Sequence, residues 1–375
     1  MRFKAERTQF ADAVLWAQRT VGDRATLPAV AGIRLVLAGD RLVLSSTNLE
    51  TESELTIPVQ AEREGTALVL GKLLADVARS LPPAPVSADV QGDVLHLTCE
   101  RARFALRLIP AEDFPSLRQA AAAGATAVMK AEDFARTVAQ VARAAGTDDA
   151  RPVLTGVHME ATSDRLAVAA TDSYRLAVRT VDWDQDAQGT AVVPRRALEQ
   201  ARHTAELLGG EVRMVLESGQ VSFAFGDRRL CSRLIEGTFP DYRQLLPTDA
   251  QRRLEVDRAQ LVDVVKRVSV VGEADPVSSP VTLDLSADTV RVTAGSGEVG
   301  RGEESLPARL EGDDLQIAFN PRYLTDGLEA ADGERVLMEF RDELQPAVIR
   351  PSSDDATTER SGGAQFVYLL MPVRL

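Results

Sequence analysis

The residues of this chain that most often do chemistry are scattered rather than clustered. The histidines are His96, His158 and His203, one in each of three separate stretches, whereas a metal site needs several ligands in one place. Cys99 and Cys231 lie in strand-like segments and form neither a disulfide framework nor a metal-binding spacing. We therefore expect no catalytic residue, no metal and no cofactor, and two buried, reduced cysteines.

One glycine-rich motif, Gly295-x-Gly297-x-x-Gly300, matches the dinucleotide-binding fingerprint. That fingerprint requires a helix to follow at once, because the helix N-terminus holds the pyrophosphate. Residues 301–307 have no helical apolar period. The alternatives are a nucleotide site and a glycine-rich hairpin, and the pattern favours the hairpin.

Basic residues gather on predicted helices, although the net charge of −13 argues against an ordinary DNA-binding domain. Acidic residues fill predicted loops and strands instead. For any one helix the alternative is an ordinary solvated face. Because the pattern recurs, it favours basic helices that line a hole and acidic sheets that face solvent. The helix residues are Lys72, Arg79, Arg136, Arg143, Arg195, Arg196, Arg202 and Arg322.

An internal repeat positions these residues. Phe10, within residues 5–12, matches Phe134, within residues 130–136, with an offset of 124. The same offset brings Pro28 onto Pro152, and a third copy starts at Leu254. A unit of about 120 residues is long enough to bury its own core. We predict an α+β fold of three repeated domains, 1–118, 126–250 and 251–375, each with two helices packed on antiparallel sheet.

The apolar spacing predicts the elements of each copy. Each copy opens with an amphipathic helix, around Phe10, Phe134 and Leu261. The second helices begin at Gly71, Pro194 and Pro321. We expect linkers at 119–125 and 247–250, a mobile loop at 351–363 and a last strand at 366–375. No apolar run reaches the length of a membrane span, and residues 1–6 lack a signal-peptide core, so a cytoplasmic protein is expected.

Three segments resemble those of the bacterial DNA polymerase III β subunit, the sliding clamp. They are 170–177 (Ala-Thr-Asp-Ser-Tyr-Arg-Leu-Ala), 239–247 (Phe-Pro-Asp-Tyr-Arg-Gln-Leu-Leu-Pro) and 368–375 (Tyr-Leu-Leu-Met-Pro-Val-Arg-Leu). The resemblance covers the whole chain. It implies a non-catalytic processivity factor, a head-to-tail homodimer that closes a six-domain ring around duplex DNA, with helices lining the hole.

The resemblance also implies where partners bind: the DNA polymerase III α subunit, the clamp loader and other clamp-motif proteins. Their peptide pocket would lie between the second and third domains. Its residues would be Leu154, Thr171, Asp172, Ser173, Tyr174, Arg175, Leu176, Pro247, Pro346, Met371, Pro372, Val373 and Arg374. Val270 and Val271 match apolar interface positions of the dimer, and Arg24 matches a DNA-contacting loop.

Two departures from the family pattern leave alternatives open. Many clamps have Gly-His where this chain has Ser173-Tyr174, and the loop at Asp148-Asp149 is acidic where DNA-touching polar residues are frequent. The alternatives are a specialised paralogous clamp, for example one that resists an inhibitor, and a clamp-like scaffold that does not encircle DNA.

Overall fold

The computed structural model describes residues 1–22, 27–118, 125–182, 188–247, 249–272, 279–295, 300–352 and 365–374. The chain divides into two compact units, Met1–Phe134 with Gln200–Leu234 and Ala135–Glu199 with Ile235–Leu375. The boundaries of the units fall inside two helices of the second repeat, so this repeat contributes residues to both units. Among the described residues, we find no helix that has both the length and the apolar character of a membrane span.

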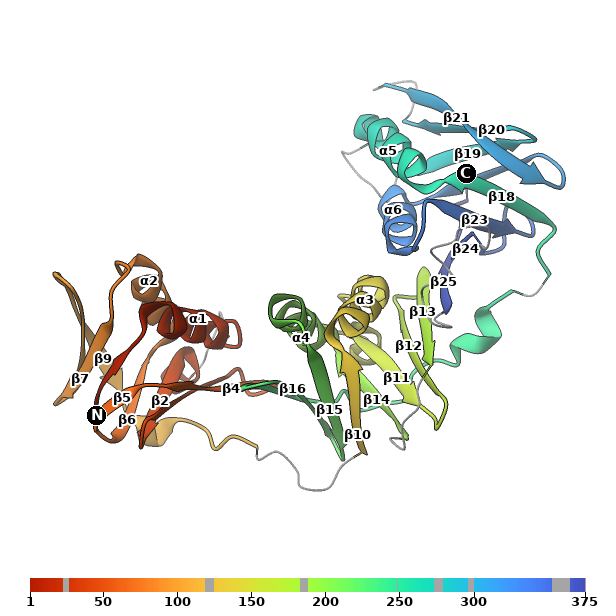
Figure 1. Cartoon of the computed structure of the whole chain (residues 1–375). Coiled ribbons are helices and arrows are strands. Elements are labelled where there is room, and N and C mark those ends of the chain that lie inside the picture. The colour runs from red at the N-terminus through yellow and green to blue at the C-terminus, as the bar shows by residue number, and fades with distance from the viewer. Residues whose placement is uncertain are drawn as a thin grey trace. The chain divides into compact units, whose positions relative to one another are not determined.

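Each repeat contains two α-helices, as predicted. They are α1 (Arg7–Gln18), α2 (Gly71–Ser80), α3 (Ala131–Val141), α4 (Arg195–Leu208), α5 (Arg258–Ser269) and α6 (Pro321–Ala330) (Figure 1). Side chains before α1, α5 and α6 satisfy free backbone donors of the first turn. Asp257 accepts from the Gln260 N–H at 2.8 Å, and Asn320 accepts from the N–H groups of Arg322 and Tyr323.

The predicted helix starts are correct at Gly71 and Pro321 and one residue early in the second repeat. There, Pro194 still pairs with Gly156 as the last residue of a strand, so α4 begins at Arg195. The prediction that each copy opens with a helix is wrong. A short strand precedes α1, α3 and α5, and its alternation of buried and exposed residues spans too few positions to stand out in the sequence.

The first unit holds a 13-stranded antiparallel sheet in the order β10-β15-β16-β17-β4-β3-β2-β6-β9-β8-β7-β1-β5. Helix α1 packs against α2 (Figure 1) and against β2, β3 and β4, and its Trp16 is buried. The Trp16 indole N–H donates to Thr204 Oγ1 at 3.0 Å. The strands are β1 (Arg2–Ala5), β2 (Gly32–Ala38), β3 (Arg41–Thr47), β4 (Thr51–Pro58), β5 (Gln60–Arg63), β6 (Gly65–Leu70), β7 (Val86–Gln91), β8 (Val94–Cys99), β9 (Ala102–Ile109), β10 (Ala125–Lys130), β15 (Glu211–Glu217), β16 (Gln220–Phe225) and β17 (Arg228–Arg233).

The second unit holds a 12-stranded antiparallel sheet in the order β14-β11-β12-β13-β25-β24-β23-β18-β21-β20-β19-β22. Helix α5 packs on α6, and α6 packs on β25. Gly327 permits this approach, because a Cβ there would lie 2.5 Å from the Tyr368 ring. The strands are β11 (Gly156–Ala161), β12 (Arg165–Thr171), β13 (Arg175–Asp182), β14 (Gly189–Pro194), β18 (Arg252–Asp257), β19 (Val281–Ser286), β20 (Thr289–Ala294), β21 (Gly302–Glu311), β22 (Leu315–Phe319), β23 (Arg335–Phe340), β24 (Ala347–Pro351) and β25 (Gln365–Leu370).

Strand pairing joins one repeat to the next inside each unit. In the first unit, β17 of the second repeat pairs with β4 of the first. In the second unit, β13 of the second repeat pairs with β25, the last strand of the third. The repeats are therefore joined by backbone hydrogen bonds as well as by their connecting segments.

The last strand is shorter than predicted. It ends at Leu370, and residues 371–374 leave the ladder. Pro372 has no N–H to donate, and the Val373 N–H donates instead to the Ala318 carbonyl at 2.8 Å. The predicted linker positions 119–124 and Thr248, and residues 353–364 of the predicted loop, lie outside the described residues.

The predictions for the glycine-rich motif and the cysteines are confirmed. Gly295 and Gly300 flank the connection of β20 to β21, which are antiparallel partners, while residues 296–299 lie outside the described part. The motif therefore follows a strand into another strand and does not open a helix. Cys99 and Cys231 are buried and free.

Candidate functional site

The segment Thr171–Arg175 forms a tight turn between β12 and β13. Asp172 Oδ1 accepts from the backbone N–H groups of Tyr174 and Arg175 at 2.9 and 3.1 Å. The Thr171 hydroxyl donates to the Arg175 carbonyl at 2.7 Å and accepts from the Ser173 N–H at 3.1 Å. These bonds hold Ser173 at a φ of +82°, a left-handed conformation that is uncommon for residues other than glycine. The side chain of Tyr174 is left 60% exposed at the tip of the turn.

Arg175 is buried beneath this turn, where its charge is fully paired. Its Nε donates to Asp172 Oδ2 at 2.9 Å, and its Nη1 donates to the carboxylate of Asp326 in α6. The guanidinium carbon also lies 4.3 Å from the centre of the Tyr323 ring. That ring is stacked with Tyr174 at 6.5 Å between ring centres. The turn is thus anchored by charge to the third repeat and capped by two aromatic rings.

The C-terminal segment lies against the same turn. The Met371 N–H donates to the Tyr174 carbonyl at 2.9 Å, and the Met371 side chain is 39% exposed. Pro372 and Val373 are half-buried and Arg374 is exposed. An exposed methionine beside an exposed tyrosine provides an adaptable apolar surface for a docking segment.

The loop that precedes β11 is tied to the turn from the other direction. Arg151 Nη1 donates to Ser173 Oγ at 3.0 Å, and the Gly146 N–H donates to the Leu154 carbonyl at 2.7 Å. Arg151 also lies 3.5 Å from Asp148, one of the two acidic residues noted in the sequence. Leu154 is half-buried beside the turn, so this loop forms part of its surroundings.

Leu176 supplies the floor rather than the open wall of the site, because it is only 1% exposed. It belongs to a buried cluster with Leu369, Phe239 and Tyr242, against which Leu246 packs. The cluster joins β13, β25 and the segment that connects the second repeat to the third. Leu245, next in the chain to Leu246, is 52% exposed and extends the apolar surface.

Pro247 and Pro346 lie together, but in a neighbouring pocket of about 490 Å³ floored by Phe340 and Val348. Tyr323 and Asp326, which position Arg175, were not predicted from the sequence. They lie on α6, 148 and 151 residues from Arg175, and the only signal in the sequence is their spacing of three residues, which places them on one face of a helix.

The predicted DNA-facing residues differ in their exposure and in whether they already bind other groups of the protein. Lys72, Arg196 and Arg322 are exposed, and no ion pair involves them within the described part of the chain. Arg195 and Arg136 are half-buried. The exposed cations keep their full capacity to attract an anion from solution.

Other predicted basic residues already bind carboxylates or carbonyls. Arg79 pairs with Asp76 at 2.7 Å, and Arg202 pairs with Glu206 at 2.6 Å. Arg143 is half-buried and donates to the Asp326 carbonyl at 3.2 Å, so it supports the contact with α6. Arg24 lies outside the described residues.

Val270 and Val271 form an exposed apolar step directly after α5, at 60% and 36% exposure. Gly302 lets β21 approach this step, since a Cβ there would lie 3.0 Å from the Val268 carbonyl and 3.3 Å from Val271. The preceding Arg267 forms a two-bond ion pair with Glu304 at 2.7 and 3.0 Å. Two exposed valines rimmed by charge have the composition of an interface core.

Comparison with known proteins gives one consistent result. Domains of the DNA polymerase III beta subunit match residues 1–118 (N-terminal domain), 128–241 (central domain) and 243–361 (C-terminal domain). A beta sliding clamp of Streptomyces coelicolor is 38% identical over 387 residues, covering all of both chains. The beta sliding clamp homolog GriR of Streptomyces muensis is 33% identical and covers 100% of this chain and 99% of its own. The structure of a Pseudomonas aeruginosa sliding clamp bound to griselimycin superposes with a TM-score of 0.90 at 26% identity, covering all of both chains.

The buried ion cluster predicts unequal costs for two carboxylate substitutions. Asp326→Ala would leave the Arg175 charge, 7% exposed, with Asp172 as its remaining close carboxylate. We expect the free energy of unfolding of the second unit to fall by roughly 2–4 kcal/mol. Asp76→Ala, which removes the exposed pair with Arg79, should change it little. Thermal or urea denaturation of both variants measures this, and equal losses would contradict a buried, specific role for Asp326.

Proposed function

This chain belongs to the DNA polymerase III beta subunit family and is a sliding clamp, the processivity factor of a replicative DNA polymerase; we propose that it acts as a closed homodimeric ring around duplex DNA. Two copies of three domains, 1–118, 126–250 and 251–375, would make a ring of six. The observation that carries the proposal is the threefold family match along the chain, joined to the exposed valines at the end of α5.

We infer a non-catalytic role in the bacterial cytoplasm. A ring holds duplex by topology, so it needs no reacting group and little affinity. Strong phosphate contacts would oppose sliding, because each contact that releases counterions tightens binding. Exposed cations such as Lys72, Arg196 and Arg322, which form no ion pair with the described residues, suit the weak attraction that a mobile ring requires.

We propose the surface around Tyr174 and Met371 as the docking site for the polymerase III α subunit, the clamp loader and other clamp-motif proteins. Its support is an apolar surface over a rigid base, with Arg175 held by Asp172 and Asp326. A buried leucine or phenylalanine anchor contributes about 1.5–3 kcal/mol, which suits exchange among competing partners.

A specialised clamp that resists an inhibitor is the second candidate. The resistance is favoured by the wall that Tyr174 forms with Tyr323, and the match to a protein named as a clamp homolog, GriR, favours a paralogous clamp. Griselimycin, present on the Pseudomonas aeruginosa clamp, is the probe. This candidate would be supported if the wild-type protein binds griselimycin weakly and the Tyr174→His variant binds it tightly.

A charged side chain in place of Val270 or Val271 should prevent the dimer from forming. We expect Val270→Glu and Val271→Glu to give monomers with folded domains, because an interface core does not tolerate an unpaired carboxylate. Leu344→Glu, at a site 55% exposed elsewhere in the unit, is the control and should stay dimeric. Sedimentation velocity with circular dichroism measures both properties. If both valine variants remain dimeric, this assignment is wrong.

The basic helices should act on DNA through their field rather than by base contacts. We expect Arg195→Ala, Arg196→Ala and Arg322→Ala together to weaken retention of loaded protein on circular DNA and to flatten its salt dependence. Arg233→Ala with Arg309→Ala, which changes strand arginines, should have little effect. Linearising the DNA should release every variant. Equal retention on linear and circular DNA would instead indicate the clamp-like scaffold that does not encircle DNA.

The docking site should depend on its last residues. Removal of residues 371–375 should abolish binding of a short peptide of the Gln-plus-hydrophobic type and leave the dimer intact. Tyr174→His should change the ranking of such peptides more than the best affinity, because it alters the wall and leaves the floor at Leu176 unchanged. Fluorescence titration of the three proteins measures both effects. Unchanged binding by the truncated protein would remove this site from the proposal.

A further inference from the structure

One face of the second unit's sheet runs without interruption from the docking site into the third repeat. Leu176 on β13 lies opposite Leu369 on β25, and Leu369 lies opposite Val348 on β24. Val348 in turn lies opposite Glu339 on β23, and Glu339 opposite Arg253 on β18. Residues opposite one another in antiparallel strands point to the same side. Across five strands this row therefore changes from apolar residues, next to the Thr171–Arg175 turn, to charged residues on β23 and β18.

The segment that connects the second and third repeats crosses this face and borders two pockets on it. Tyr242 and Leu246 pack on the apolar end of the row and help to line a pocket of about 300 Å³. Pro247 lines the second pocket, of about 490 Å³. Both pockets are lined by Arg350, so they adjoin at this side chain, and we refer to the two together as the groove.

The groove is basic although the chain as a whole is acidic. Its charged lining residues are Arg165, Arg243, Arg253, Arg341, Arg350, Glu160 and Glu339. The lining has five arginines against two glutamates. Just outside it, Asp249 lies 3.0 Å from Arg341 and Asp164 lies 3.8 Å from Arg165, so the groove with these two neighbours has an excess of one positive charge in a chain whose net charge is −13.

The two glutamates are already neutralised by their neighbours. Glu339 is half-buried and lies 3.1 Å from Arg350 and 3.6 Å from Arg253. Glu160 accepts from Arg243 at 2.6 Å. Each guanidinium carries five N–H donors in total, so these pairs leave donors directed to solvent. Arg253 and Arg243 remain 57% exposed.

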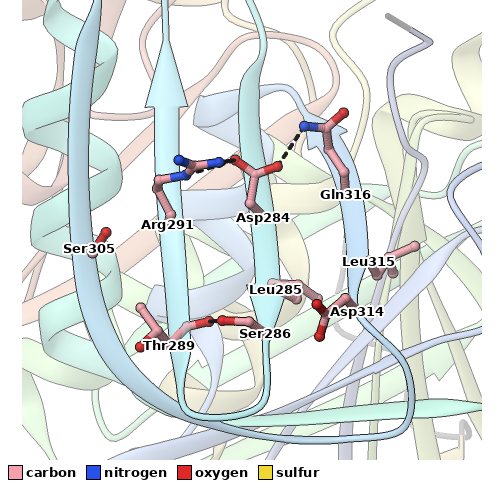
Figure 2. A pocket seen from close by; sticks show the side chains of 9 residues that line it. All are labelled: Asp284, Leu285, Ser286, Thr289, Arg291, Ser305, Asp314, Leu315 and Gln316. Atoms are coloured by element: carbon pink, nitrogen blue, oxygen red, sulfur yellow. Dashed lines mark hydrogen bonds and ion pairs between the residues drawn. The ribbon is translucent and has the colours of Figure 1, made fainter.

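Another pocket of the same unit has a lining of the opposite net charge. It also measures about 490 Å³, and its charged lining residues are Asp284, Asp314 and Arg291. Figure 2 shows Asp284 held between the side chains of Arg291 and Gln316. Its lining has an excess of one negative charge, and it would repel a carboxylate.

We propose that the groove receives an acidic segment of the partner chain, adjoining the apolar residues that the partner places at the docking site. This inference rests on the docking role proposed above and adds a specificity to it. Charge complementarity selects the occupant: aspartate and glutamate side chains match the guanidinium groups, and Pro247, Pro346 and Phe340 accommodate their aliphatic parts. Partners with acidic flanks would be preferred over those with basic flanks.

The test uses three labelled peptides with one Gln-plus-hydrophobic anchor and flanks of aspartate, serine or lysine. We expect the aspartate flank to tighten binding to the full-length dimer roughly fivefold over serine at low salt, with most of the gain lost at about 0.5 M salt. Arg253→Glu with Arg341→Glu should abolish this gain and leave the serine peptide unchanged. Arg253→Gln with Arg341→Gln, a milder change, should reduce it. Arg291→Glu is the matched control and should keep it.

The outcomes separate the two proposals. Equal affinity for the three flanks, or the same loss for all three peptides in the Arg253/Arg341 variants, would overturn the groove and leave the docking site intact. Displacement of the aspartate peptide by a single-stranded oligonucleotide at the same concentration would also overturn it, because the groove would then bind any polyanion. If the serine peptide does not bind at all, the docking proposal fails and the groove fails with it.

Discussion

The antiparallel pairing of β13 with β25 is the interaction on which the second unit depends. It joins strands of the second repeat to the last strand of the third and so makes one sheet of two domains. On the helix side, Arg175 of β13 pairs with Asp326 within α6, and Arg179 pairs with Asp332 just beyond the end of α6. The C-terminal end of a helix favours cations, so the pairing and the helix dipole act together. The strand pair that joins the two repeats therefore also supports the Thr171–Arg175 turn.

The first repeat has an equivalent turn beside a strand pair that joins two repeats, but that turn is covered. Residues 47–51 form the same turn as 171–175, with the same side-chain bonds and a positive φ at its third residue. There, however, Arg118 covers the turn: its backbone N–H binds the buried Glu52 at 2.8 Å, and its guanidinium reaches turn carbonyls at 3.3 and 3.5 Å. The offset of 124 brings Glu52 onto Leu176. A buried carboxylate draws the connecting segment onto the first turn, and an apolar residue leaves the second turn open.

Elements that depend on local chemistry could be predicted from the sequence, whereas elements and contacts that depend on packing could not. The repeats, their paired helices and the starts at Gly71 and Pro321 follow from apolar spacing and from residues suited to a helix's first turn. The short strands that open each repeat carry too few residues for a period to emerge. Arg175 was recognised by its motif, but its partner Asp326 lies 151 residues away and is selected by how α6 packs on β25. Contacts of that range depend on the assembled sheet, which no local pattern encodes.

A net charge of −13 does not conflict with the two proposed roles that attract anions, because local charge decides each of them. At physiological ionic strength the field of an exposed charge decays over about 8 Å, so distant carboxylates contribute little at a basic patch. Exposed cations such as Lys72 and Arg196 lie on α-helices, whereas the groove arginines lie on sheet strands, next to a strand end or on the connecting segment. The helices present dispersed charge, which suits weak attraction to a uniform phosphate backbone. The groove instead concentrates guanidinium groups beside an apolar floor, which suits a short acidic segment held in one register.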